Sequence, residues 1–336
     1  MAEGTATPVT GLAELAVVRR SGFVESRHLG SLLALDADGR VAVALGDPDA
    51  TILPRSTTKP LQALACVRAG APLEGPEVAI ASGSHTGQDE HVEVVRRILD
   101  RAGLTEDALQ CPADWPEDEA TRDRLIRAGE RRSAVRMNCS GKHAAMLLAC
   151  TVNGWPTGDY LSPDHPLQLR VREVFAEWTG EPVRHDAVDG CGAPLFGVSV
   201  RGLAAAFRRL RIAAPDTEAA TVAGAMRAHP LHVGGSGQAN TELMRLVPGA
   251  LAKGGVEGVI AVAGPDGQAV AMKVIDGSPR ATTLVALRVL EGLGVDVSGA
   301  GSLSTVPVLG RGLPVGEIAP GGAIEQWFRG VAAGAA

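Results

Sequence analysis

The sequence predicts an α+β fold (mixed α/β in looser naming), in which an antiparallel sheet formed by the N- and C-terminal segments encloses a helical middle. Three observations predict this fold. One β-hairpin pattern lies at residues 32–45 and a second lies at residues 256–274. Between them, apolar residues recur at helical spacing in several segments. Strands at both ends with helices between them are typical of one sheet closed by both termini.

The first hairpin follows a tail. Residues 1–12 are expected to form a flexible tail and residues 13–336 a single domain, because the sequence shows no repeat and no obvious linker. The apolar runs 32–35 and 41–45 flank a turn at residues 36–39, whose sequence is Asp-Ala-Asp-Gly. Two apolar runs around such a turn predict a hairpin.

A Ser-x-x-Lys pair opens the next predicted helix. Ser56 and Lys59 are three residues apart, so a hydroxyl and an amine can meet on one helix face. Pro60 is tolerated only in a first helical turn, and Leu61 and Leu64 begin a buried apolar face. A neutral Lys59 amine can take the Ser56 proton and make the serine a nucleophile. An exposed helix start with a solvated lysine gives the same pattern.

Lysine is scarce in this chain, and the scarcity favours the first of these interpretations. The sequence has 28 arginines and only four lysines, which are Lys59, Lys142, Lys253 and Lys273. A guanidinium cannot lose its proton in a protein, whereas a desolvated lysine amine can. A chain that uses arginine almost everywhere and keeps lysine at four positions therefore favours a chemical role for each lysine.

A serine loop comes next along the chain. Residues 77–81 are predicted to form a short buried strand that runs into the polar loop 82–87, where Ser84 stands beside His85. A helix follows this loop, and residues 105–135 are expected to cover the site as loop and short helix. The Ser84 hydroxyl is a candidate nucleophile, although a cap of the following helix explains it equally well.

Cysteine and lysine repeat the three-residue spacing at the start of a second buried helix. Cys139 and Lys142 occupy these positions, and Cys191 lies in a glycine-flanked loop together with Asp189. Thiols bind zinc readily, but lysine does so rarely because its amine must first lose a proton. Spacing alone therefore favours Cys139 as a buried small hydrophobe, with metal binding as the minority interpretation.

The second half of the chain adds helices and the second hairpin. Lys253 lies in a Gly-rich segment just before the strand predicted at 256–263, and its partner strand is predicted at 268–274. The order Ser-x-x-Lys, serine loop, then Lys-x-Gly before a strand parallels serine β-lactamases and penicillin-binding proteins. Apolar residues at helical spacing predict helices at residues 166–178, 202–210, 215–228 and 281–293.

Charge and composition exclude several classes of function. A net charge of −6 argues against nucleic acid as a partner. No apolar run approaches the ~20 residues that span a bilayer, and no secretory signal is evident. The five cysteines form no disulfide-like framework. Reduced thiols in a cytoplasmic protein, with no membrane partner, are therefore expected.

Six motifs between about residue 14 and residue 290 resemble the asparaginase II family, the Ser–Lys class of L-asparaginase. These motifs are Ser56-Thr57-Thr58-Lys59-Pro60-Leu61-Gln62-Ala63, Ala81-Ser82-Gly83-Ser84-His85, Asn138-Cys139-Ser140-Gly141-Lys142-His143, Pro163-Asp164-His165-Pro166, Asp189-Gly190-Cys191 and Lys273-Val274-Ile275-Asp276-Gly277. The resemblance implies a fold similar to glutaminases and serine β-lactamases, a homodimer, and hydrolysis of the L-asparagine side-chain amide to L-aspartate and ammonia.

The same resemblance implies roles for individual residues and a bound metal. It implies two Ser–Lys tandems (Ser56 with Lys59, and Ser84 with Lys253), zinc ligands (Cys139, Lys142 and Cys191) and substrate-binding residues (His85 and Asp189). The resemblance therefore implies a bound zinc ion, and it implies no organic cofactor. Lys273 competes with Lys253 for the second tandem, and either Ser56 or Ser84 can be the serine that forms the covalent intermediate.

Two other functions stay open beside the amidohydrolase. A β-lactamase-like or peptidase-like serine hydrolase would use the same Ser–Lys pairs, but nothing in the sequence suggests export to where its substrates are met. A zinc-dependent protein that binds asparagine without catalysis is the third interpretation. Ammonia release from L-asparagine separates the amidohydrolase from both.

Overall fold

An eight-stranded antiparallel sheet forms one half of the molecule. The structure, a computed structural model, describes residues 7–334, so residues 1–6 of the predicted tail lie outside the described residues. The strands are β1 (Ala13–Arg20), β2 (Phe23–Leu35), β3 (Val41–Leu45), β4 (Thr51–Ile52), β5 (His185–Val188), β6 (Pro194–Ser199), β7 (Leu251–Gly255), β8 (Val259–Ala263), β9 (Ala269–Val274), β10 (Val306–Gly310) and β11 (Leu313–Pro320). The large sheet has the order β10-β11-β1-β2-β9-β8-β7 with β3 also paired to β2, and a small sheet has the order β4-β6-β5.

Strand β2 joins the two ends of the chain. Its first half pairs with β1, and its second half pairs with β3 on one side and with β9 on the other. The β2–β9 register runs from Gly30 opposite Val274 to Leu35 opposite Ala269. Because β2 is N-terminal and β9 is C-terminal, the sheet is built from both terminal segments, which confirms the predicted α+β class.

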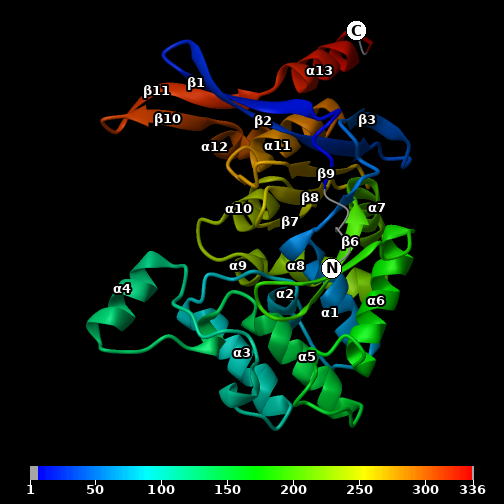
Figure 1. The fold of residues 1–336 in the computed structure, drawn as a ribbon, viewed down its shortest axis with the longest axis vertical. Coiled ribbons are helices and arrows are strands. Elements are labelled where there is room, and N and C mark those ends of the chain that lie inside the picture. Colours follow the sequence, from blue (N-terminus) through cyan, green and yellow to red (C-terminus); the bar gives the residue numbers. More distant parts are fainter. Residues whose placement is uncertain (1–6, 335–336) are drawn as a thin grey trace.

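Helices and loops make up the rest of the described chain, and the helices of the middle segment form the other half of the molecule (Figure 1). They are α1 (Lys59–Arg68), α2 (Pro76–Ala81), α3 (Asp89–Arg101), α4 (Glu119–Arg127), α5 (Ser140–Val152), α6 (Pro166–Thr179), α7 (Val200–Arg211), α8 (Glu218–Ala228), α9 (Pro230–Val233), α10 (Ala239–Leu246), α11 (Thr282–Gly292), α12 (Gly301–Ser304) and α13 (Gly322–Gly334), with 3₁₀ turns η1 (Arg55–Thr58), η2 (Glu106–Ala108), η3 (Ala134–Arg136) and η4 (Ser298–Ala300). In residues 7–334, no helix is both long enough and apolar enough to cross a membrane.

The centre of the large sheet is covered on both faces. Every residue of β8 is buried, and neighbouring residues of a strand point to opposite faces of a sheet. Helix α7 packs on β2, β8 and β9, while α11 packs on β8, β9 and β11. The core therefore continues from the sheet into the helical half, and β7, the last strand of the sheet, lies where the two halves meet (Figure 1).

Most predicted elements are confirmed, and one is wrong. Both hairpins exist, as β2–β3 and β8–β9, and helices cover the four segments predicted in the second half of the chain. Residues 77–81, however, belong to helix α2 and not to a strand. Pro76 occupies the first turn, where its missing N–H costs nothing, and Glu77 lies at the positive end of the helix. The single-domain boundary stays a prediction.

Candidate active site

Ser56, Ser84 and Lys253 line one pocket of about 330 Å³. Three separate elements supply them: η1 carries Ser56, the loop after α2 carries Ser84, and β7 carries Lys253. The structure thus gathers side chains that are far apart in sequence at the junction of the sheet and the helical half. Glu117 and Asn138 also line this pocket.

Lys59 is buried directly behind the pocket, where it is 1% exposed. Its Nζ donates to Ser84 Oγ at 2.8 Å and to the Asn138 carbonyl oxygen at 3.3 Å. The described hydrogen bonds of this amine therefore join it to Ser84, whereas the predicted tandem joined it to Ser56. A buried amine must find acceptors inside the protein, and the serine loop and the Asn138 carbonyl provide them. The tandem roles themselves stay a prediction.

Lys253 lies on β7 and is fully buried. A β-carbon added to Gly255, two residues along the strand, would lie 3.2 Å from the backbone nitrogens of Ser56 and Thr57. Residues two apart point to the same face of a strand, so the Lys253 side chain starts from the face that packs against η1. Burial, and then the positive charge of Lys59, lower the pKa of Lys253 far below that of an ordinary lysine. This shift favours the neutral amine, the form that can accept a proton. The described hydrogen bond of this amine goes to the Gly254 carbonyl oxygen, and that of the Lys273 amine goes to the Glu257 carbonyl oxygen.

Backbone contacts fix the loop that carries Ser84. The Ser84 N–H donates to the Val233 carbonyl at 2.8 Å, and the His85 N–H donates to the Asn138 carbonyl at 3.2 Å. In the buried His85 ring, Nδ1 accepts from the Gly87 N–H, and Nε2 lies 2.9 Å from the Ser140 hydroxyl. Both ring nitrogens are thus engaged within the protein, and burial lowers the pKa of His85. The predicted substrate-binding role of His85 stays a prediction.

Gly83→Ala is expected to misplace the serine loop and to lower the free energy of unfolding by about 1–3 kcal/mol, the usual cost of overpacking. An added methyl group would lie 2.6 Å from the His232 carbonyl oxygen and 2.9 Å from that of Val233. Urea denaturation and the rate of turnover measure the two effects. The matched control is Gly224→Ala on α8, where no atom lies within 4 Å and the gain in helix propensity is up to about 1 kcal/mol. Equal stability of the two variants would contradict the packing argument.

Arg55 precedes Ser56 in an unusual backbone conformation. Its φ is +52°, in the left-handed region that few residues other than glycine adopt. The guanidinium Nε donates to Asp189 Oδ1 at 2.8 Å. Burial favours the neutral acid, but Lys142 and Arg55 outweigh it and hold the pKa of Asp189 below its usual value. This ion pair anchors η1, and the predicted substrate-binding role of Asp189 stays a prediction.

Cys139, Lys142 and Cys191 lie together beside Asn138, all buried. Lys142 Nζ lies 3.1 Å from Cys191 Sγ. The Cys139 thiol has two acceptors within reach, the Asn138 side-chain oxygen at 3.1 Å and the Cys191 sulfur. The hydrogen bond from Cys139 and the charge of Lys142 lower the pKa of Cys191 to about 5, despite its burial. These influences favour the thiolate of Cys191 beside the Lys142 amine.

This cysteine–lysine cluster suits zinc in the identity of its donors. Two sulfurs and one nitrogen are ligands that zinc accepts, and a three-ligand site leaves a coordination position open. Burial acts to lower the pKa of Lys142, but the neighbouring cysteines outweigh it and raise that pKa, so metal binding must displace the proton of the amine. In residues 7–334, no group of three or more His, Cys, Asp or Glu side chains is arranged to hold a metal. A three-ligand site at this cluster would therefore include Lys142.

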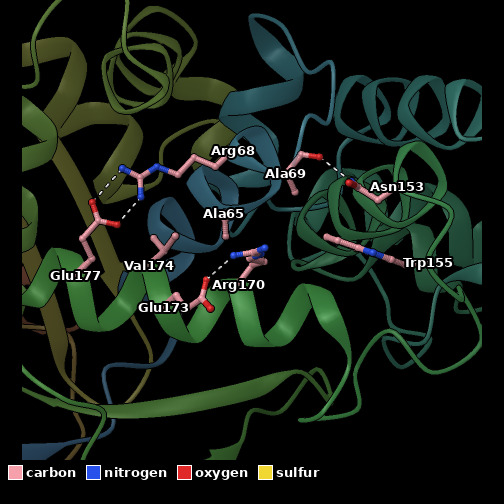
Figure 2. Close-up of a pocket in the computed structure, with 9 residues that line it drawn as sticks. All are labelled: Ala65, Arg68, Ala69, Asn153, Trp155, Arg170, Glu173, Val174 and Glu177. Atoms are coloured by element: carbon pink, nitrogen blue, oxygen red, sulfur yellow. Dashed lines mark hydrogen bonds and ion pairs between the residues drawn. The ribbon is translucent and has the colours of Figure 1, made fainter.

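A second cleft, also about 330 Å³, lies between α1, the end of α5 and α6 (Figure 2). Its charged groups neutralise one another: Arg68 forms a two-point ion pair with Glu177, and Arg170 pairs with Glu173. The Asn153 amide donates to the Ala69 carbonyl. These pairings leave the serine pocket as the better candidate for the reaction.

Sequence reasoning named the two serines and Lys253 of the pocket lining, but it assigned no role to Glu117 or to Arg55. Glu117 lies in the irregular segment predicted only to cover the site, and no spacing in the sequence points to it. Arg55 stands directly before the Ser-x-x-Lys pair, and no sequence pattern assigns it a role. Only its pairing with Asp189, 134 residues away, shows what it does.

One protein family and several solved structures are similar to this chain. The structures include the native form of Mglu (15% identity, TM-score 0.46, 80% of this chain and 65% of that chain covered) and EstCE1, described as a hydrolase with promiscuous acyltransferase activity (14% identity, TM-score 0.41, 76% and 92% covered). The chain thus spans just under two thirds of Mglu. No curated protein matches it. The family model for L-asparaginase II matches residues 16–320. The chain therefore belongs to the L-asparaginase II family.

Proposed function

We propose that this protein hydrolyses the side-chain amide of L-asparagine to L-aspartate and ammonia. One observation carries the proposal: two serine hydroxyls and a lysine amine of lowered pKa line a single pocket, with a second buried lysine bonded to one serine. Membership of the family supports an amidohydrolase. A serine with a neutral amine as its base is sufficient for acyl transfer from an amide.

In the first step, Ser56 Oγ attacks the amide carbon while the Lys253 amine takes the hydroxyl proton. The carbon becomes tetrahedral, and its oxygen takes the negative charge. Backbone N–H groups at η1 would stabilise that oxyanion. The C–N bond then breaks, and Ser84, held by Lys59 at 2.8 Å, passes a proton to the nitrogen. Ammonia leaves, and a β-aspartyl ester of Ser56 remains.

In the second step, water replaces the amine. The Ser84–Lys59 pair removes a proton from the water, whose oxygen attacks the ester carbon. The bond from that carbon to Ser56 Oγ breaks, and the ammonium of Lys253 returns its proton to the serine. Every group then regains its starting protonation state, with aspartate as the product.

Zinc is proposed as an accessory of this site. Cys139, Lys142 and Cys191 would hold it, and when bound it would supply a fixed positive charge beside Asn138. The residues of this chain then keep their own tasks: Asn138 accepts from Lys59 through its carbonyl oxygen, and Asp189 fixes Arg55.

Cys191→Ser is expected to lower zinc affinity by on the order of 100-fold or more, because it removes a sulfur ligand. Zinc content after dialysis against graded chelator concentrations measures the effect without relying on turnover. Cys66→Ala is the matched control, since Cys66 is a buried thiol of α1 outside the cluster. Equal zinc retention by the two variants would contradict the assignment of the ligands.

Ammonia release from L-asparagine and L-glutamine by the purified protein tests the proposed function. Added hydroxylamine should trap the ester as β-aspartyl hydroxamate, which distinguishes acyl transfer through a serine from direct hydrolysis. A folded, zinc-supplied protein that releases no ammonia would refute the proposal. Hydrolysis of a chromogenic β-lactam would then point to the serine hydrolase alternative, and asparagine binding without turnover to the binding protein.

A further inference from the structure

We propose that Glu117 binds the α-ammonium group of the substrate and thereby makes the pocket selective for a free α-amino acid amide. The inference rests on the proposed function, since it assigns a substrate contact in the same pocket. It adds what the Ser–Lys chemistry does not supply, because two serines and two lysines can act on any small amide. Three features support this role of Glu117. They are the geometry around its side chain, the charges of the pocket and the position of the reacting groups.

The segment that holds Glu117 is tied to the serine loop on both sides. The Asp118 N–H donates to the Thr86 carbonyl at 3.1 Å. Pro116 packs so closely on Gly87 that a β-carbon there would lie 3.0 Å from the proline ring. Glu117 stands between these two anchor points. Its backbone is therefore fixed relative to the loop that carries Ser84.

The carboxylate of Glu117 is also oriented. Its Oε1 accepts from Asn138 Nδ2 at 2.7 Å, and the carbonyl oxygen of the same Asn138 accepts from Lys59. One residue therefore links Glu117 to the amine that holds Ser84. A carboxylate can accept several hydrogen bonds, so the second oxygen is left for a ligand in the pocket.

The charges of the pocket single out Glu117. Among the described residues that line it, Glu117 is the one acid and Lys253 the one base. The negative charge of Glu117 acts to raise the pKa of Lys253, against burial and the charge of Lys59, which lower it. An asparagine whose amide faces the serines must place its ammonium elsewhere in this pocket. Glu117 is the lining group with the opposite charge, and a charge-assisted hydrogen bond is the strong kind.

Binding to protein that cannot turn over tests this inference directly. Ser56→Ala protein, with and without Glu117→Gln, is titrated with L-asparagine and with succinamate, which is asparagine without its amino group. Hydrogen bonds to charged groups predict that Glu117→Gln weakens L-asparagine binding by roughly 10- to 100-fold. Succinamate binding should change by less than about 2-fold, because that ligand has no ammonium to lose.

The choice of variants separates recognition from structure. The amide introduced by Glu117→Gln keeps an oxygen that can accept from Asn138, so the loop keeps its link. Glu119→Gln on α4, which removes an exposed acid nearby, is the control. Equal weakening of both ligands would overturn the proposal in favour of a structural role. Unchanged asparagine binding, or no asparagine binding to the Ser56→Ala protein, would also overturn it. Failure of the proposed function appears separately, as absent ammonia release from the unmodified protein.

Discussion

Ser56→Ala is expected to lower kcat for L-asparagine by on the order of 10⁵-fold, because the nucleophile of a serine hydrolase acts as one unit with its base. Ser56 is half-buried at the pocket, between Arg55, held by Asp189, and the close contact of η1 with Gly255. Removing one oxygen atom leaves these contacts in place. The unfolding transition should therefore be unchanged, and only turnover should be lost.

Steady-state ammonia release and hydroxamate formation measure this effect, and Ser302→Ala, an exposed serine of α12, is the control. Ser84→Ala provides the sharper comparison. If Ser84 only relays protons, its loss should cost about 10²- to 10⁴-fold, and the hydroxamate should still form. A Ser56→Ala protein that keeps forming the hydroxamate, while Ser84→Ala does not, would reverse the roles of the two serines.

Local sequence patterns were sufficient for the elements in which one physical signal dominates. The β2–β3 and β8–β9 hairpins follow from apolar runs around turn sequences that contain glycine. The strand predicted at residues 77–81 was wrong because a short apolar run is compatible with either a strand or a helix. Pro76 was the available signal, since proline is favoured at the first position of a helix.

The scarcity of lysine drew attention to four residues, three of which are buried in the structure while Lys273 is half-buried. Lys59, Lys142 and Lys253 are 1%, 2% and 0% exposed, and all three lie at or beside the pocket. The residues that these lysines contact could not be predicted from the sequence. Lys59 contacts Ser84 because α1 and the serine loop pack together, and that packing is set by the whole core.

Strands β1, β7, β10 and β11 were also missed, and for β7 the reason is its composition. The segment around Lys253 is rich in glycine and alanine, which are poor strand formers. It becomes strand β7 because it pairs with β8 across five residue pairs. Glu117 could not be predicted for a similar reason, because only tertiary contacts bring its irregular segment to the pocket. Local sequence patterns cannot predict which residues meet in a site that is assembled from distant segments.

Lys253→Met is expected to abolish turnover and at the same time to stabilise the fold, by about 1–2 kcal/mol near neutral pH. Lys253 is fully buried, and burial together with Lys59 lowers its pKa. The lowered pKa favours the neutral amine in the folded protein, whereas the unfolded chain holds this lysine protonated at neutral pH. Methionine has a similar length and no charge to desolvate, so the cost of burial disappears together with the base.

The pKa shift of Lys253 determines how the free energy of unfolding changes with pH. The lowered pKa of Lys253 means that the unfolded state binds one more proton than the folded state, at every pH between the folded pKa and the ordinary lysine value. Stability of the unmodified protein thus rises with pH by about 1.4 kcal/mol per unit from this group alone. The advantage of Lys253→Met should grow by that amount for each unit that the pH falls, until the folded pKa is reached.

Urea denaturation of both proteins at several pH values measures this difference directly. Lys273→Met is the matched control. That lysine is half-buried on β9, and its pKa is lowered less than that of Lys253. We therefore expect a smaller stabilisation and little loss of turnover. Lys253→Arg should be inactive and less stable, since a guanidinium keeps its proton when buried. A Lys253→Met protein that is less stable than the parent at every pH would show that the amine is charged in the folded state. Lys253 could then not be the base that takes the serine proton.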